Sequence, residues 1–259
     1  MKKAFLFLGC AMLFLSTCMS VPAPAPVSAS AQEQGESGRW IAGTQDGALV
    51  VIGVANRHLR RQDEIAAARQ NAAGKVAMFY GMGGMIESIL RTDGGVLGFA
   101  ADSRITLNPT FDYRQFIDRL RFDADYDVFE INGGTLIQFR YEARVTPINF
   151  TGVMEADGRP NWANGHLPVV SGYAAAVGVS QNQLWLRDTV TRSVHAAAAS
   201  IIEGGATVVR SQVTETGIGT ASYIITRSEG FLNNFRVLEF WINPENGYVY
   251  TLGIARVVE

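Results

Sequence analysis

The sequence predicts an α+β fold made of two repeated modules, each with an amphipathic helix packed on a small antiparallel sheet. The first observation is an internal repeat, in which residues 47–77 and 172–202 share one pattern at a constant offset of 125. The second is that, in each copy, a strand-like apolar run precedes a stripe of helical period. The third is that each copy is followed by two extended runs with a turn between them. A repeat this long indicates two modules.

The repeat keeps identical residues as well as apolar character. The identical pairs are Gly47 and Gly172, Gly53 and Gly178, Val54 and Val179, Leu59 and Leu184, Asp63 and Asp188, Ala72 and Ala197, and Ala73 and Ala198. Residues 47–54 favour a buried strand, and the apolar stripe at residues 65, 68, 72, 76 and 79 favours a helix with Asp63 as its N-cap. In the second copy we expect a strand over residues 174–179 and a helix that Asp188 caps.

Further extended segments complete each predicted module. Residues 128–141 and 237–254 each read as a hairpin, because turn-forming residues separate two strand-like runs. Residues 96–105 and 206–213 are expected to be extended as well, and residues 112–120 have the spacing of a short helix. Residues 223–235 favour no single element.

The end of the chain resembles a known family. The pattern lies in Val237-Leu-Glu-Phe-Trp-Ile-Asn-Pro-Glu-Asn-Gly-Tyr-Val-Tyr-Thr-Leu252, with support from Gly178-Val-Ser180 and Val209-Arg-Ser-Gln-Val-Thr-Glu215. It is similar to the small bacterial envelope lipoprotein family named for a twenty-kilodalton outer-membrane antigen. The resemblance covers residues 172–256 well and 47–143 weakly, since the first hairpin has no Trp or Pro and family members have one module. It implies a helix on an antiparallel sheet, export to the envelope, and binding or assembly work without catalytic residues.

Composition is that of a globular protein with two modules. The 259 residues are 47% hydrophobic and 18% charged, which is enough for a sizeable core and two domains of about 100 residues each. We expect a first module over residues 47–143, a connector over 144–171 and a second module over 172–259. The net charge is −2 and the basic residues are dispersed, so nucleic acid is not an expected partner.

The first residues predict a signal peptide. Lys2 and Lys3 precede an apolar stretch over residues 4–16, which is too short for a comfortable membrane span. Export of the mature protein is therefore expected, either to the periplasm or to an anchored position in the cell envelope.

Two processing sites fit this leader, and both stay open. Lipidation at Cys18 would remove residues 1–17, although the preceding Thr17 is unusual at such a site. Cleavage between Ala31 and Gln32 would instead remove residues 1–31 and leave residues 32–46 as a flexible N-terminal segment. Both cysteines, Cys10 and Cys18, lie here, so the mature modules are expected to have no disulfide and no cysteine metal site.

Catalytic and metal-binding patterns are weak along the chain. His58, His166 and His195 are scattered, and none has a second ligand at a suitable spacing, so we predict no metal site. The glycines in residues 81–84 follow a helix, which predicts a helix stop and a flexible turn rather than a phosphate loop. The acidic residues in 123–130 lack the spacing of a calcium loop and are expected to lead into a strand.

Two carboxylates and three aromatic residues remain as candidates. Glu130 and its counterpart Glu239 precede the predicted hairpin turns, where a structural role is expected. Trp241, Tyr248 and Tyr250 form a candidate binding patch on the last hairpin. An exposed face there would bind a partner protein or a glycan, whereas a face turned to the helix would belong to the core.

The sequence therefore predicts a noncatalytic, exported cell-envelope protein that acts as a lipoprotein-like binding or assembly scaffold. Its expected partner is an envelope protein or a glycan, and no cofactor is expected. One alternative is a carboxylate-dependent envelope hydrolase. Another is a subunit of a larger envelope or flagellum-associated assembly, in which exposed sheet edges of several copies pair with one another.

Overall fold

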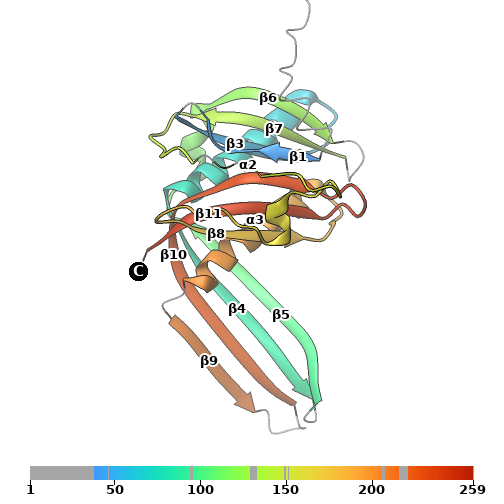
Figure 1. Cartoon of the computed structure of the whole chain (residues 1–259), viewed down its shortest axis with the longest axis vertical. Coiled ribbons are helices and arrows are strands. Elements are labelled where there is room, and N and C mark those ends of the chain that lie inside the picture. Colours follow the sequence, from blue (N-terminus) through green and yellow to red (C-terminus); the bar gives the residue numbers. More distant parts are fainter. Residues whose placement is uncertain are drawn as a thin grey trace, which may run out of the picture.

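A computed structural model describes residues 38–45, 47–93, 96–128, 133–148, 150, 152–205, 208–215 and 221–258. Within these ranges the protein combines helices with two antiparallel sheets, which confirms the predicted α+β class. Figure 1 shows the smaller sheet at one end of the molecule and the larger sheet below it.

The smaller sheet carries helix α2 on one face. Its strand order is β2 (Gly43–Gln45), β3 (Ala48–Asn56), β7 (Gly134–Tyr141) and β6 (Leu120–Val128), and all neighbours are antiparallel. The predicted stripe of helix α2 (Arg61–Tyr80) packs here, with Ala68, Ala72, Val76 and Phe79 in one buried cluster with residues of β3 and β7. The short helix η1 (Tyr113–Arg119) closes this cluster with the buried Phe116.

The larger sheet is organised around strand β10 (Ala221–Ile242). The N-terminal half of β10 lies between β9 (Val208–Glu215) and β4 (Met82–Asp93), and β5 (Val96–Pro109) pairs with the outer side of β4. The C-terminal half lies between β1 (Arg39–Ile41) and β11 (Val249–Val258), and β8 (Ala174–Ser180) pairs with β11. One strand therefore belongs to two different strand sets.

Strand β10 changes its partners at a bulge. Its register with β11 shifts between Asn233 and Arg236, and Asn234 has a φ of 56°. Asparagine tolerates this left-handed conformation better than most residues, and a bulge bends the strand that contains it. On the N-terminal side of the bulge, the paired parts of β9, β10, β4 and β5 extend away from the body of the protein (Figure 1). We call this four-stranded part the projecting sheet.

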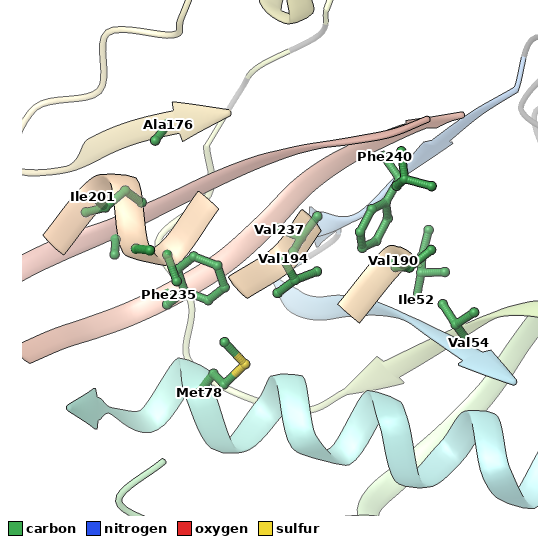
Figure 2. Packing of buried hydrophobic residues seen from close by; sticks show 14 of the residues in the cluster. Ile52, Val54, Met78, Ala176, Val190, Val194, Ile201, Phe235, Val237 and Phe240 are labelled. Carbon is green, nitrogen blue, oxygen red and sulfur yellow. The ribbon is translucent and has the colours of Figure 1, made fainter. Parts of the chain in front are cut away.

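Helix α3 (Leu186–Gly204) joins the two sheets through the largest core cluster. Its apolar stripe includes the buried residues Val190, Val194 and Ile201. In Figure 2 the side chains of Val190 and Val194 lie between β3 and the strands of the larger sheet, and Ile201 lies nearer Ala176. The cluster also contains Ile52, Val54, Met78, Phe235, Val237 and Phe240, so both halves of the chain contribute to one core.

Two glycines of the repeat allow the helices to approach their strands closely. A Cβ atom at Gly53 would overlap the carbonyl oxygen of Ala68 in α2, and one at Gly178 would overlap that of Ser193 in α3. Gly178 and Ser193 each follow their counterpart by 125 positions. The same strand-to-helix contact thus occurs in both halves, and it requires glycine because any side chain would push the helix away.

The connector packs on the face of the larger sheet that α3 leaves uncovered. Trp162, in the short helix η2 (Asn161–Asn164), is fully buried in a cluster with Leu238, Trp241 and Leu252. Phe150 packs against the same cluster, whereas Leu167 is exposed.

The two-module organisation itself is not confirmed. A strand, a helix and a final hairpin follow one another in both halves. However, β4 and β5 of the first half extend the larger sheet, whose other strands include β8 to β11 of the second half. The boundaries at residues 143 and 172 therefore stay predictions.

The predicted helix N-caps are wrong. Helix α2 begins at Arg61 and α3 at Leu186, so Asp63 and Asp188 lie inside the first turn. Neither N-cap residue makes a side-chain capping bond. A carboxylate in the first turn still interacts favourably with the positive end of the helix dipole, which explains why aspartate recurs there without capping.

The predicted turn after α2 is also wrong, although the helix stop is confirmed. Gly81 ends α2 and its N–H donates to the carbonyl of Met78. Gly83 and Gly84 belong to strand β4, where a Cβ on Gly84 would overlap the side chain of Ile202. Gly84 therefore allows close packing on α3, and these residues form a strand rather than a flexible turn. Residues 223–235, which the pattern left unassigned, lie in β10.

Alanine substitutions at three glycines test the close helix–strand contact. We expect Gly53→Ala and Gly178→Ala each to lower the free energy of unfolding by at least about 2 kcal/mol, because the new methyl overlaps helix backbone. Gly74→Ala is the matched control, since Gly74 lies within α2 with open space around it, and it should stabilise by about 1 kcal/mol. Urea denaturation measures all three, and equal effects at positions 53 and 74 would refute the close approach.

Candidate functional site

The projecting sheet is the candidate functional site. At its base, one row of paired residues is buried and the next row is more exposed. Ile86 pairs with Ser228 on one side and Ile105 on the other, and the first two are buried. The next row contains Glu87 and Arg227, whose side chains form an ion pair 3.0 Å long in a more exposed position. One side of the base is therefore packed on the core, and the other side faces solvent.

The outer strands of the projecting sheet each have one open edge among the described residues. Strand β9 pairs only with β10, and β5 pairs only with β4. An open edge presents backbone N–H and C=O groups that can bond to another extended chain. Because they lie on a part of the sheet that extends away from the body, these two edges are candidates for interaction.

The extended segments predicted at residues 96–105 and 206–213 are confirmed as β5 and β9, but the other two strands of this sheet were not predicted. The local pattern indicates a turn at the start of β4 and favours no single element in the first part of β10. The run Tyr223-Ile-Ile-Thr226 is rich in β-formers and was the available local signal. The pairing of β4 with β10 joins residues as far apart as Glu87 and Arg227, 140 positions, which no local pattern reveals.

The predicted aromatic patch is largely covered. Trp241 is 3% exposed, and its ring lies 5.1 Å from that of Tyr250, which is half-buried like Tyr248. The covering element is the connector with Trp162, and α3 lies on the opposite face. The patch is thus neither a free surface nor core beneath a helix, and only the tyrosines present partly exposed surface.

Glu239 fastens three segments together. The carboxylate is buried and accepts hydrogen bonds from Nε and Nη2 of Arg39 in β1. Arg39 Nη2 also donates to the carbonyl of Gly152 in the connector at 2.8 Å. Burial raises the pKa of the Glu239 carboxyl, and the bonds from Arg39 offset only part of that rise. Its counterpart Glu130 lies outside the described residues.

A second buried carboxylate, Glu64, organises the start of helix α2. It accepts from the backbone N–H of His58 at 3.0 Å, from Arg61 Nη1 at 2.6 Å and from Thr135 Oγ1 at 3.0 Å. Burial alone would raise the pKa of Glu64, but these bonds and the charge of Arg57 outweigh burial and lower it. The local pattern did not indicate this role for Glu64, because the neighbouring Asp63 had the pattern of a cap.

Two buried cations face a small internal cavity. The cavity has a volume of about 10 Å³ and is lined by residues of β3, β10 and α2, including Lys75 and Arg236. This is room for about one water molecule and not for an organic ligand. Arg236 Nη1 donates to Thr44 Oγ1 at 2.7 Å, while Nε and Nη2 are buried and have no hydrogen-bond acceptor among the described residues.

Lys75 is the more costly of these cations. It donates to the carbonyl of Ile52, and its ammonium lies 5.0 Å from the centre of the Phe240 ring. No carboxylate pairs with it in the described part of the chain. Burial lowers the pKa of Lys75 to about 7. Burial and the charge of Lys75 also lower the pKa of His195 on the neighbouring helix.

The remaining predicted residues gather into no site. His58 and His166 are exposed and His195 is half-buried, and the described residues contain no group of three His, Cys, Asp or Glu that could hold a metal ion. Cys18, Ala31 and Gln32 lie outside the described residues. Asp123, Asp125 and Asp127 fall in strand β6. Neither α2 nor α3 has the length and apolar character needed to cross a membrane.

The depressed lysine pKa predicts a pH-dependent stability. The unfolded chain binds a proton at residue 75 up to about pH 10.5, whereas the folded protein releases it near pH 7. The free energy of unfolding is therefore highest above pH 10.5, and it decreases as the pH falls from there through about 7. Lys75→Met should flatten this rise and stabilise the protein by about 3–5 kcal/mol at pH 7.

Denaturation followed by circular dichroism at steps between pH 6 and 10.5 measures the effect. Arg192→Met is the control, because Arg192 is exposed on α3 and its loss should leave the slope unchanged. A Lys75→Met protein with the slope of the unsubstituted protein would show that residue 75 does not titrate in this range.

A double-mutant cycle tests the fastening role of Glu239. Arg39→Met and Glu239→Gln should each cost about 3–5 kcal/mol, and the double variant less than their sum, because each single change leaves a buried group unpaired. The exposed pair Arg121 and Glu142, 2.8 Å apart, is the control and should cost less than about 1 kcal/mol per change. Additive effects at residues 39 and 239 would contradict the coupling.

Comparison with known proteins identifies no relative. No family model matches the chain, and neither a curated protein nor a solved structure matches it. The resemblance to the envelope lipoprotein family therefore stays a prediction from the residues quoted above. The evidence on the function of this chain is the geometry of the projecting sheet and of the body that holds it.

Proposed function

We propose that this chain is a noncatalytic, exported cell-envelope protein that serves as a binding or assembly scaffold. The observation that carries the proposal is the projecting sheet, with an open edge on each side and packing on the body only at its base. A sheet with open edges recruits other extended chains through backbone hydrogen bonds. The leader of the sequence supports export, to the periplasm or to an anchored position in the envelope.

The polar groups of the interior favour a scaffold over the alternative hydrolase. The buried carboxylates Glu64 and Glu239 are both engaged by arginines, in ion pairs that hold segments together. A glycosidase would need two carboxyl groups facing one substrate-sized space. The cavity beside Lys75 is too small for a sugar ring, and no carboxylate is among the residues that line it.

Shortening the projecting sheet tests the scaffold role. Glu87 is the partner of Arg104, and Arg227 is the partner of Arg210, and all four residues share one row. Asn-Gly can therefore replace residues 88–103 and 211–226 as tight hairpin turns at the same level. The contacts of Gly84 and Gly230 with α3 are kept. We expect a folded body that no longer enters the cross-linked complexes that the full protein forms in envelope fractions.

The same preparation tests export through the intact mass of the mature protein. The mass should correspond either to an acylated chain beginning at Cys18 or to a chain beginning at Gln32. An unprocessed chain outside the envelope fraction would refute export. Unchanged complexes of the shortened protein, or turnover of an envelope substrate that a single side-chain change abolishes, would refute the scaffold.

A further inference from the structure

The two open edges of the projecting sheet run in opposite directions. Strand β5 is antiparallel to β4, β4 is antiparallel to β10, and β10 is antiparallel to β9. Three reversals leave β5 and β9 antiparallel to each other. The β9 edge of a second copy, placed beside β5 in the same orientation, therefore continues the antiparallel order without turning the molecule over.

The two edges also lie at the same level of the sheet. Val208 shares a row, across Glu229 and Met85, with Thr106 of β5. Six rows further on, Thr214 shares a row with Ala100. Both edges are thus open over seven rows, which is about 24 Å of strand. Two edges of equal length at one level can meet without leaving either partly unpaired.

The edges carry little of the usual protection against pairing. Natural edge strands are commonly blocked by charged residues, above all lysine, by proline or by a covering element. Strand β9 contains neither proline nor lysine, and its charged residues are Arg210 and Glu215. Strand β5 carries Asp102 and Arg104, and its only proline, Pro109, lies at its end. In the described residues, β9 pairs with no strand other than β10.

We propose that copies of this chain join head to tail, with β5 of one copy pairing antiparallel with β9 of the next. This rests on the proposed scaffold function and names a second copy of the chain as the partner. The contact is heterologous, since different edges meet, so each added copy leaves one β5 and one β9 edge open. Assembly ends only when a ring closes, and otherwise it continues as a filament.

Edge-blocking variants separate this arrangement from other forms of association. The first variant carries Ala101→Lys and Ser103→Lys in β5, and the second carries Ser211→Lys and Val213→Lys in β9. All four positions lie in the same two rows of the sheet. Lysine on an edge strand opposes pairing with a further strand. The control has the same added charge at Gln181 and Leu184, which are exposed outside the projecting sheet.

Sedimentation velocity on the full chain, processed by its host, gives the number of copies. The unsubstituted protein and the Gln181→Lys/Leu184→Lys control should form species of more than two copies. Each edge variant alone should be a single copy. An equimolar mixture of the two should form pairs only, because one open β5 and one open β9 remain to meet. Formation of this pair also shows that both variants kept their fold.

Three results would overturn the proposal. An unsubstituted protein that stays a single copy at high concentration would exclude self-pairing, yet leave the scaffold role for another partner. An edge variant that pairs with itself would show that like edges meet. A mixture that stays as single copies while the control assembles would place the contact elsewhere. If circular dichroism shows that a double-lysine variant is unfolded, Ser103→Lys and Ser211→Lys alone replace it in the same mixing experiment.

Discussion

The continuous backbone pairing of strand β10 is the interaction on which the rest of the structure depends. Over 22 residues it bonds to four other strands, two along each half. Its C-terminal half carries α3 on one face and the connector on the other, and its N-terminal half carries the projecting sheet. The bulge at Asn234 allows both arrangements in one strand, because it bends the strand where the partners change.

The body is closely packed where its helices meet the strands, and buried ion pairs join its separate segments. Small residues bring both helices against their strands, so the core has little freedom to shift. The buried carboxylates Glu64 and Glu239 are each paired with arginine, and they tie the start of α2 and the N-terminal strand to the sheets. Lys75 has no such compensation, and its buried amine lowers the stability of the protein at neutral pH.

A projecting sheet on such a body supports the proposed assembly role over a catalytic role. The sheet has two open edges, whereas the interior has space for about one water molecule. Backbone edges recognise strand direction and length rather than a particular small molecule. A second copy of the same chain meets both requirements, because the two edges are antiparallel and lie at one level of the sheet.

Local patterns in the sequence were sufficient to predict several helices and hairpins. The helical stripe with Ala68, Ala72 and Val76, its counterpart in α3 and the last hairpins all follow from periodicity and turn residues. The packing of the connector residue Trp162 against the larger sheet was also predictable, since a large apolar ring in a polar segment needs cover.

The other features depend on contacts between distant parts of the chain, and these contacts form only in the tertiary structure. Gly84 looks like a turn residue until the side chain of Ile202 is placed against it. The sequence leaves open whether Trp241 is exposed or buried, and the connector that covers it answers the question. The projecting sheet exists because β4 pairs with β10, far along the chain, and a strand's partner is set by the free energy of the whole sheet rather than by its own residues.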